Sequence, residues 1–434
     1  MYWLSKAIHR LNRMRRRGLV FLAVLGPGLI TMIADNDAGG ISTYAVTGSR
    51  FGFSLLWVIL LLIPIAFFIQ EMTVRLGAVT KRGHAEAIFE GFGPFWGWFA
   101  IGDLAIVNWL TLVTEYIGMT EAMSMFGVPP VVTYLSVTAI LLAIVLSGRY
   151  WTFEKITMIF CLFNLVYIPA AFWAMDMPTA PSWGVVAGGL LPVFEGGFNA
   201  DILFIILAVI GTTVTPWQIF FQQSAVVDKG MDVKDVAFGK WDTLVGSIVT
   251  CVVAAFIIIA TGAALHFHDP PIVVEDAKQT AEALVPLLSN GQGEWARRLF
   301  AIGLFDAGFL GALCISLSSS WAIGEVAGWA HSLNRSVREA PWFYLAYVGM
   351  LLTAGGVVLI PGAPLVTITM YVQVAAITLL PASLIFLILL LNDRGFMGDH
   401  VNSRWQNVVN IVIVAVIIVI STVFAMTTLF PGLI

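Results

Sequence analysis

Two groups of polar residues interrupt apolar stretches of this sequence, and both are rich in oxygen atoms. Residues 34–40 read Ala-Asp-Asn-Asp-Ala-Gly-Gly and supply two carboxylates and an amide. Residues 211–218 read Gly-Thr-Thr-Val-Thr-Pro-Trp-Gln and supply three hydroxyls beside a proline. Carboxylate and carbonyl oxygens are the ligands that hard divalent cations prefer. If the fold brings the two groups together, they predict a cation site.

The composition places both groups in a membrane. Of 434 residues, 59% are apolar and 11% are charged, against roughly 45 to 50% and about 25% in soluble domains. The mean hydropathy is +0.91, and a membrane-spanning helix needs about 20 apolar residues. A soluble globule is therefore excluded, and the lipid bilayer is an expected partner. The net charge of -4 gives no basic surface for nucleic acid.

The apolar runs predict an all-α protein with eleven transmembrane helices in a single transporter domain, residues 1–434. Membrane strands would alternate apolar and polar residues, and these runs do not. No linker or change in composition marks a second domain. The expected spans are 19–47, 54–76, 95–126, 131–147, 154–175, 200–226, 242–265, 298–330, 341–360, 364–391 and 407–430.

Basic residues lie mainly on one side of these spans. The segment before residue 19 carries one lysine and five arginines, and most other Lys and Arg fall on the same side. The exceptions are Arg50, Lys278, Arg297 and Arg298. Because basic loops stay cytoplasmic, we expect a multi-pass protein of the plasma membrane with a cytoplasmic N-terminus and an extracellular C-terminus.

The two polar groups lie at matching depths in the first and sixth spans. A charge at the bilayer centre costs about 2.5 to 3.5 kcal/mol, and Pro216 frees carbonyls near Thr212 and Thr213. This pattern predicts a LeuT-like inverted 5+5 repeat with discontinuous helices 1 and 6, in which the broken helices meet at the midplane and bind ions. The repeats would span about 19–175 and 200–391, with an extra helix at about 407–430.

Alternative functions follow from the same architecture. An amino-acid transporter shares the inverted repeat, but it would offer helix N-termini to a carboxylate that Asp37 would repel. An enzyme is not expected, because the sequence contains no HExxH, GxSxG or phosphate-loop motif. Cys161, Cys251 and Cys314 are far apart within apolar runs and are expected to be buried packing residues. No cofactor is expected, and the sequence leaves the oligomeric state open, with a monomer compatible with it.

Further motifs carry a resemblance to a known family. They are Gly-Pro-Gly at 26–28, Asp-Ala-Gly-Gly at 37–40, Thr-Val-Thr-Pro-Trp at 213–217, Gln-Val at 373–374 and Leu-Pro at 380–381. With them the chain resembles the Nramp family of divalent-metal transporters over nearly its whole length. Family members carry Asp-Pro-Gly-Asn at the first break and Ala-Thr-Val-Met-Pro-His at the second, so this sequence departs from both patterns.

The resemblance implies a set of metal-binding positions. Asp37 matches the metal-binding aspartate, the carbonyls of Ala34 and Thr212 match those that face the ion, and Gln373 matches a residue that approaches it. Thr215 replaces the family's methionine, whose thioether favours transition metals. The remaining residues expected to line the cavity are Gly40, which replaces an asparagine ligand, together with Asp35, Trp217, Glu115 and Thr213.

These replacements predict a hard, all-oxygen site, which suits Mg²⁺. They also resemble the magnesium-transporting branch of the family, whose members accept Mn²⁺ as well. Leu112, Ala105 and Trp217 stand where relatives carry proton-coupling acids and a histidine. We therefore predict uncoupled Mg²⁺ uptake by alternating access. The membrane potential would supply about 2.3 kcal/mol per charge per 100 mV. The alternative is a proton-coupled Mn²⁺/Fe²⁺ importer of the ordinary type.

Overall fold

The computed structural model describes residues 26–192, 200–285, 292–363 and 365–430, which form a bundle of helices without a strand in these ranges. Short 3₁₀ turns join some helices, and a π turn, Gly262–His266, extends one of them. The helices are α2 (Pro27–Ile33), α3 (Ala38–Phe51), α4 (Leu56–Thr80), α5 (His84–Phe92), α6 (Pro94–Ser124), α7 (Pro130–Leu146), α8 (Tyr150–Phe163), α9 (Tyr167–Met175), α10 (Trp183–Gly188), α11 (Ala200–Thr213), α12 (Pro216–Asp228), α13 (Val236–Thr261), α14 (Ala277–Leu284), α15 (Gln292–Ala327), α16 (Pro341–Gly356), α17 (Leu365–Asn392), α18 (Arg394–Met397) and α19 (Arg404–Leu429).

The all-α prediction is confirmed, and each expected span contains a helix. Within the described ranges, eight helices are long and apolar enough to cross a membrane, or nine if the bent pair Thr378–Asn392 and Arg394–His400 is one span. The first expected span falls short because it is divided into α2 and α3, and its residues 19–25 lie outside the described part. The apolar helix α7, with 17 residues, is also too short to be counted among these membrane-spanning helices. The count of eleven therefore stays a prediction.

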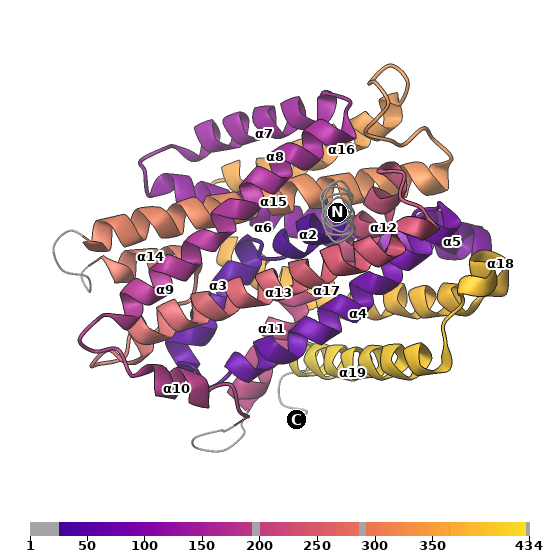
Figure 1. Ribbon diagram of the computed structural model, residues 1–434. Helices are drawn as coiled ribbons and strands as arrows, with labels where there is room; N and C mark the ends of the chain where they lie inside the picture. The colour runs from indigo at the N-terminus through magenta and orange to yellow at the C-terminus, as the bar shows by residue number, and fades with distance from the viewer. Residues whose placement is uncertain (1–25, 193–199, 286–291, 364, 431–434) are drawn as a thin grey trace, which may run out of the picture.

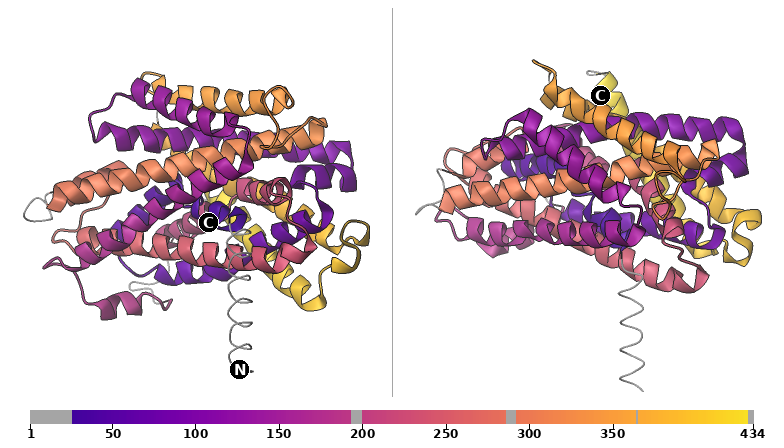
Figure 2. Two further views of the ribbon diagram at one scale, coloured as in Figure 1. Left: turned by 45° about the horizontal axis from the view of Figure 1, so that its top comes forward. Right: turned by 90° about the horizontal axis from the view of Figure 1, so that it is seen from above.

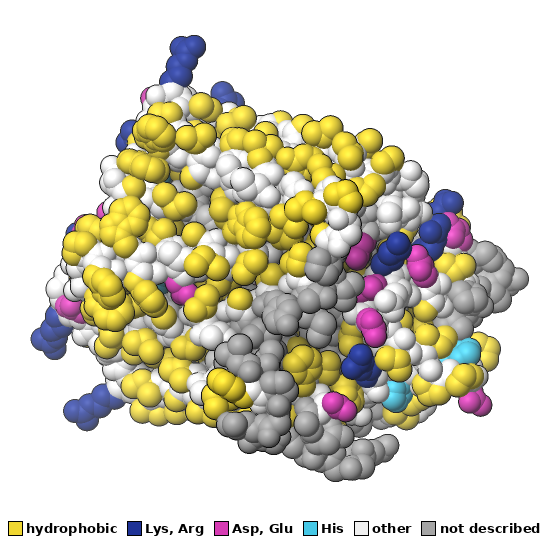
Figure 3. All heavy atoms as spheres, turned by 180° about the vertical axis from the view of Figure 1, so that it is seen from behind, with side chains coloured by type: hydrophobic (Ala, Val, Ile, Leu, Met, Phe, Trp, Pro, Cys, Tyr) yellow, Lys and Arg dark blue, Asp and Glu magenta, His cyan; other side chains and the backbone are white. Residues whose placement is uncertain are grey.

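The surface agrees with a membrane environment. On the face shown in Figure 3, hydrophobic side chains cover much of the visible surface, and most charged side chains lie toward the left and right of the view. Cys161, Cys251 and Cys314 are free and buried, as expected for packing residues.

The short helices α2 and α3 lie in the interior of the bundle. Figure 1 shows them between the long helices α13 and α15. In both views of Figure 2 the long helices again lie on either side of this central region. The contacts agree, because α13 packs against both α2 and α3 and α15 packs against α3 and along α6. Gly246 of α13 permits this approach, since a Cβ there would lie 2.9 Å from the Cβ of Met32.

Local chemistry explains why both helices break. Asp37 caps the N-terminus of α3, where its Oδ1 accepts a hydrogen bond from the Gly40 amide at 2.7 Å. α12 begins with Pro216, which has no N–H to continue α11. Its first turn is held by Gln218, whose Oε1 accepts a hydrogen bond from the Thr215 amide at 3.1 Å. The predicted discontinuities in helices 1 and 6 are therefore both present.

Candidate metal site

The two helix breaks meet at Gly40. A Cβ added there would lie 3.2 Å from the carbonyl oxygen of Asp35, 3.3 Å from Asp37 Oδ1 and 3.4 Å from Thr212 Oγ1. These atoms come from the first break and from α11, which are about 170 residues apart in the sequence. The fold thus brings the predicted ligands Asp37 and Thr212 to the same point, and the absent side chain of Gly40 leaves that point open.

The main-chain carbonyls of Ala34 and Thr212 each lose the donor that a continuous helix would supply. The residue four positions after Thr212 is Pro216, which has no N–H. The residue four positions after Ala34 is Ala38, whose amide donates to Glu115 Oε2 at 3.1 Å instead. Two carbonyls are therefore available at the breaks, as the sequence predicted, and they come from corresponding positions of the two broken helices.

Several buried side-chain oxygens at the breaks have no hydrogen-bond partner among the described residues. Such atoms are rare in folded proteins, and an ion or water usually explains them. Here they come from α6 as well as from both breaks, so three elements converge on one polar region. The atoms are both carboxylate oxygens of Asp35, Asn36 Oδ1, Glu115 Oε1, Thr212 Oγ1 and Thr215 Oγ1.

Two other predicted cavity residues, Thr213 and Trp217, contact neighbouring side chains within the protein. The Thr213 hydroxyl donates to the Val209 carbonyl at 2.8 Å and is 2.8 Å from the Tyr44 hydroxyl, so it joins α11 to α3. Trp217 is fully buried, and its ring lies edge-on to Phe221 with centroids 6.0 Å apart. Gln373 lies in α17, but its side chain is outside the described part of the structure. The roles of these residues at the ion remain predictions.

Glu115 is placed by close packing of α6 against α15. A Cβ at Gly311 would lie 2.8 Å from Glu115 Oε2, so only glycine leaves room for the carboxylate at that point. With Oε2 bonded to the Ala38 amide, Glu115 supports the start of α3.

No three His, Cys, Asp or Glu side chains among the described residues form a group that could hold a metal. A metal here would therefore depend on carbonyl and hydroxyl oxygens in addition to carboxylates.

Comparison with known proteins decides the family. Residues 28–427 match the family model described as "Natural resistance-associated macrophage protein-like", Nramp. The chain belongs to the Nramp family.

Individual relatives are distant in sequence but match over most of their length. The divalent metal cation transporter MntH of Brucella suis biovar 1 is 26% identical over 431 residues, which cover 95% of this chain and 91% of the relative. MntH 1 of Pseudomonas aeruginosa is 28% identical over 395 residues, which cover 88% and 86%. The crystal structure of the Eremococcus coleocola manganese transporter, in complex with an aromatic bis-isothiourea substituted compound, has a TM-score of 0.79 at 21% identity. That match covers 95% of this chain and 88% of the solved one, and it shows the shared fold.

A small cavity of about 50 Å³ leads away from the start of α3 in this Nramp chain. At one end it is lined by Ala38, Gly39 and Thr114, next to the helix break. At the other end it reaches acidic side chains at the end of α6 and before α14, in the loop that is expected to be extracellular. These acids are Glu121, Glu275 and Asp276. The cavity thus lies between the helix break and the expected outer side, and the predicted ligands Ala34, Asp37, Thr212 and Thr215 are not among its lining residues.

On the opposite side, α2 is clamped to α13 by Asp242. Its Oδ2 accepts hydrogen bonds from the amides of Gly28 at 2.7 Å and Gly26 at 3.1 Å, and its Oδ1 accepts one from Leu29 at 3.2 Å. A carboxylate at the N-terminus of a helix satisfies amides that have no partner within the helix. Sequence analysis missed this residue, and its only signal was an isolated acid at the start of an apolar run.

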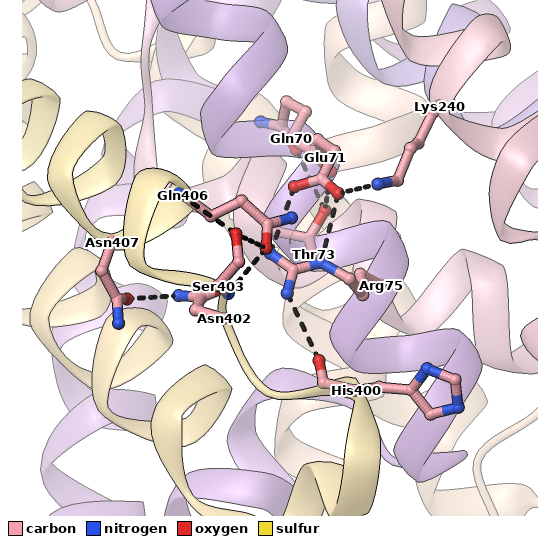
Figure 4. A network of polar contacts seen from close by, with 10 residues as sticks. All are labelled: Gln70, Glu71, Thr73, Arg75, Lys240, His400, Asn402, Ser403, Gln406 and Asn407. Atoms are coloured by element: carbon pink, nitrogen blue, oxygen red, sulfur yellow. Dashed lines mark hydrogen bonds and ion pairs between the residues drawn. The ribbon is translucent and has the colours of Figure 1, made fainter.

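A second polar network lies near the expected cytoplasmic ends of α4 and α13 (Figure 4). Glu71 accepts hydrogen bonds from Arg75, with Nε at 3.1 Å, and forms an ion pair with Lys240 at 2.7 Å. Arg75 Nη1 also reaches the carbonyl of His400 at 3.5 Å. Glu71 and Arg75 are four residues apart on α4, a spacing typical of a local ion pair. The structure adds Lys240, which makes the network a tie between α4, α13 and the segment before α19.

Proposed function

We propose that this Nramp protein moves divalent metal cations across the membrane by alternating access, with Mg²⁺ as the main substrate and Mn²⁺ also accepted. Divalent metal cation transport is the activity by which its curated relatives are named. They are transporters, not enzymes. The observation that carries the Mg²⁺ proposal is the hard character of the unpartnered acceptor atoms at the two breaks, which are oxygens; the other unpartnered atoms there, Trp217 Nε1 and Gln218 Nε2, are N–H donors that do not bind a cation.

The donor set favours Mg²⁺ over softer metals. Asp37 supplies a carboxylate, Ala34 and Thr212 supply carbonyls freed from helical bonding, and Thr215 has an unpartnered hydroxyl. Transition-metal selectivity over alkaline earths would call for a soft sulfur or an imidazole, and none of the proposed ligands provides one. Mg²⁺ also keeps several of its waters, and glycine at position 40 leaves more room beside Asp37 and Thr212 than the asparagine of the family pattern would.

We propose that transport is not coupled to protons. Leu112, Ala105 and Trp217 cannot exchange a proton near neutral pH, and one oxygen of Glu115, Oε2, accepts a hydrogen bond from the Ala38 amide. A potential of 100 mV would supply about 4.6 kcal/mol for a divalent ion, since each charge contributes about 2.3 kcal/mol. The electrical gradient alone is therefore sufficient to accumulate Mg²⁺. Because the cell interior is negative, this potential drives the cation inward across the plasma membrane.

Uptake into proteoliposomes tests both parts of the proposal. Wild-type protein is expected to take up Mg²⁺ at millimolar concentrations without acidifying the lumen, and Asp37→Ala is expected to abolish uptake. Luminal acidification in step with metal uptake would instead establish the proton-coupled Mn²⁺/Fe²⁺ importer. An amino-acid transporter is disfavoured because Asp37 already occupies the N-terminus of α3 that would bind a substrate carboxylate.

A further inference from the structure

We infer that Asp35 is a second carboxylate of the cation site beside Asp37 and that it contacts the ion through a water that the ion retains. This inference rests on the proposed function, because it assigns a further ligand to the same site. It also specifies the substrate class as a partly hydrated divalent cation. Neither the family resemblance nor the comparisons assign a role to this residue.

The first support is the contrast between Asp35 and its neighbours in the turn. Asp37 accepts a hydrogen bond from Gly40, and Asn36 donates from Nδ2 to the Thr250 carbonyl at 3.3 Å. Asp35 is also fully buried, but both of its carboxylate oxygens are without a partner among the described residues. A buried carboxylate that makes no hydrogen bond is strongly destabilising, so a group absent from the protein chain must compensate it.

The turn holds Asp35 in a fixed position. On one side the Thr250 hydroxyl donates to the Met32 carbonyl, and on the other Asn36 is bonded to the Thr250 carbonyl. Both contacts tie the turn to α13. The carbonyl oxygen of Asp35 also lies 3.2 Å from the Cβ position of Gly40, where Asp37 and Thr212 converge. A ligand held this firmly needs little reorganisation when the ion binds.

The second support is electrostatic. The charges of Asp35 and Asp37 repel each other, and no ion pair in the described residues joins either of them to a Lys, Arg or His. A divalent ion in contact with both carboxylates would offset this repulsion, and Glu115 adds a third carboxyl group to the same region.

The placement of Asp35 favours contact through water. The Asp35 atom among the three nearest to the Cβ position of Gly40 is its main-chain carbonyl oxygen and not a carboxylate oxygen. Asp37 Oδ1 faces Gly40 and Thr212. Mg²⁺ is usually bound by one or two carboxylates with several waters retained. The arrangement therefore assigns direct coordination to Asp37 and a water-mediated contact to Asp35.

The opposing possibility is that Asp35 and Asp37 share a proton, as neighbouring carboxylates do in some active sites. Asp35→Asn separates the two, because the amide has the shape of a protonated carboxyl but no charge. The control is Asp201→Asn, which removes an exposed acid at the start of α11. Binding of Mg²⁺ and of Mn²⁺ to the purified full-length protein in detergent is measured by calorimetry, and uptake is measured in proteoliposomes.

Asp35→Asn is expected to weaken Mg²⁺ binding at least tenfold while Asp201→Asn leaves it unchanged. Wild-type affinity in Asp35→Asn would overturn the inference, because a permanently neutral group would then serve equally well. If the Asn variant does not fold, Asp35→Ser provides the same test with a smaller side chain. If wild-type protein binds Mn²⁺ but not Mg²⁺, the Mg²⁺ proposal fails, and the Asp35 inference is then decided with Mn²⁺ as the probe.

Discussion

The carboxylate of Glu115 accepts a hydrogen bond from the Ala38 amide at 3.1 Å, and this bond removes the helical donor from the Ala34 carbonyl. A glutamate on α6 thereby maintains the break between α2 and α3. This relationship gives Glu115 a supporting role at the site that needs no exchange of protons.

Replacing Glu115 should separate its hydrogen bond from its charge. Glu115→Gln keeps an oxygen that can accept from the Ala38 amide, so Mg²⁺ uptake should stay within about threefold of wild type. Glu115→Ala leaves the buried amide without a partner, which costs about 1 to 3 kcal/mol, and uptake should fall at least tenfold. Thermal unfolding measures the loss of stability, and proteoliposome uptake measures the change in transport of each variant. A much greater loss of uptake in the Gln variant than expected would show that the charge itself is needed.

Gly40→Ala should impair ion binding more than folding. The added Cβ would lie 3.2 to 3.4 Å from three oxygens of the site, so it would fill the space proposed for the ion and its waters. We expect a rise of at least fivefold in the KM for Mg²⁺ and little change in the unfolding temperature. Gly349→Ala in α16 is the matched control, since a Cβ there meets nothing within 4 Å. Equal effects of the two substitutions would contradict the placement of the site.

Thr215→Met should change selectivity. It replaces an unpartnered hydroxyl by a thioether, a soft ligand that favours Mn²⁺ over Mg²⁺. Competition between the two ions in uptake assays should shift toward Mn²⁺ by about tenfold. Thr215→Ala removes the hydroxyl without adding sulfur, so it should weaken transport of both ions. An unchanged Mg²⁺/Mn²⁺ ratio in the Met variant would place Thr215 outside the coordination shell.

Asp242→Asn should loosen α2 from α13. The substitution removes the charge from an acceptor that holds three amides at the start of α2, and hydrogen bonds to charged groups are worth about 1.5 to 3 kcal/mol. We expect a small, membrane-impermeant thiol reagent to label the buried Cys251 faster in this variant. Cys161→Ala and Cys314→Ala in the background remove the other thiols. Labelling at the wild-type rate would mean that Asp242 does not hold this side of the site closed.

His84 predicts a pH dependence of stability. It begins α5, outside the spans, where burial lowers its pKa to about 4. Below the usual pKa of about 6.5, His84 is protonated in the unfolded chain but stays neutral in the folded chain. Folding stability should therefore decrease as the pH falls from about 6.5 to 4, by about 3 kcal/mol in total.

The variant His84→Asn should flatten this dependence. The Asn amide can still donate to Gln223 Oε1, which lies 2.9 Å from His84 Nδ1, but it does not titrate. His400→Asn, which replaces an exposed histidine, is the control. Thermal unfolding between pH 4 and 7 provides the measurement, and parallel curves for wild type and His84→Asn would assign the effect to another group.

Much of this organisation was predictable because it depends on local sequence. Pro216 predicts a helix break within an apolar run because it lacks an N–H. The polar residues from Asp35 to Asp37 predict another because their side chains compete for the helical hydrogen bonds. The burial of the three cysteines was equally predictable, because each lies within an apolar run.

Only the tertiary structure decided how distant residues are combined. The pairing of Glu115 with Ala38, the clamp of Asp242 on α2 and the addition of Lys240 to Glu71 each join residues more than 70 positions apart. The same holds for the meeting of Asp37 with Thr212 at Gly40. Sequence by itself determined where the helices break and that the Thr212 carbonyl loses its helical donor, because Pro216 lies four residues later and has no N–H. Packing decided which atoms at the breaks face one another, because it depends on how all the helices fit together.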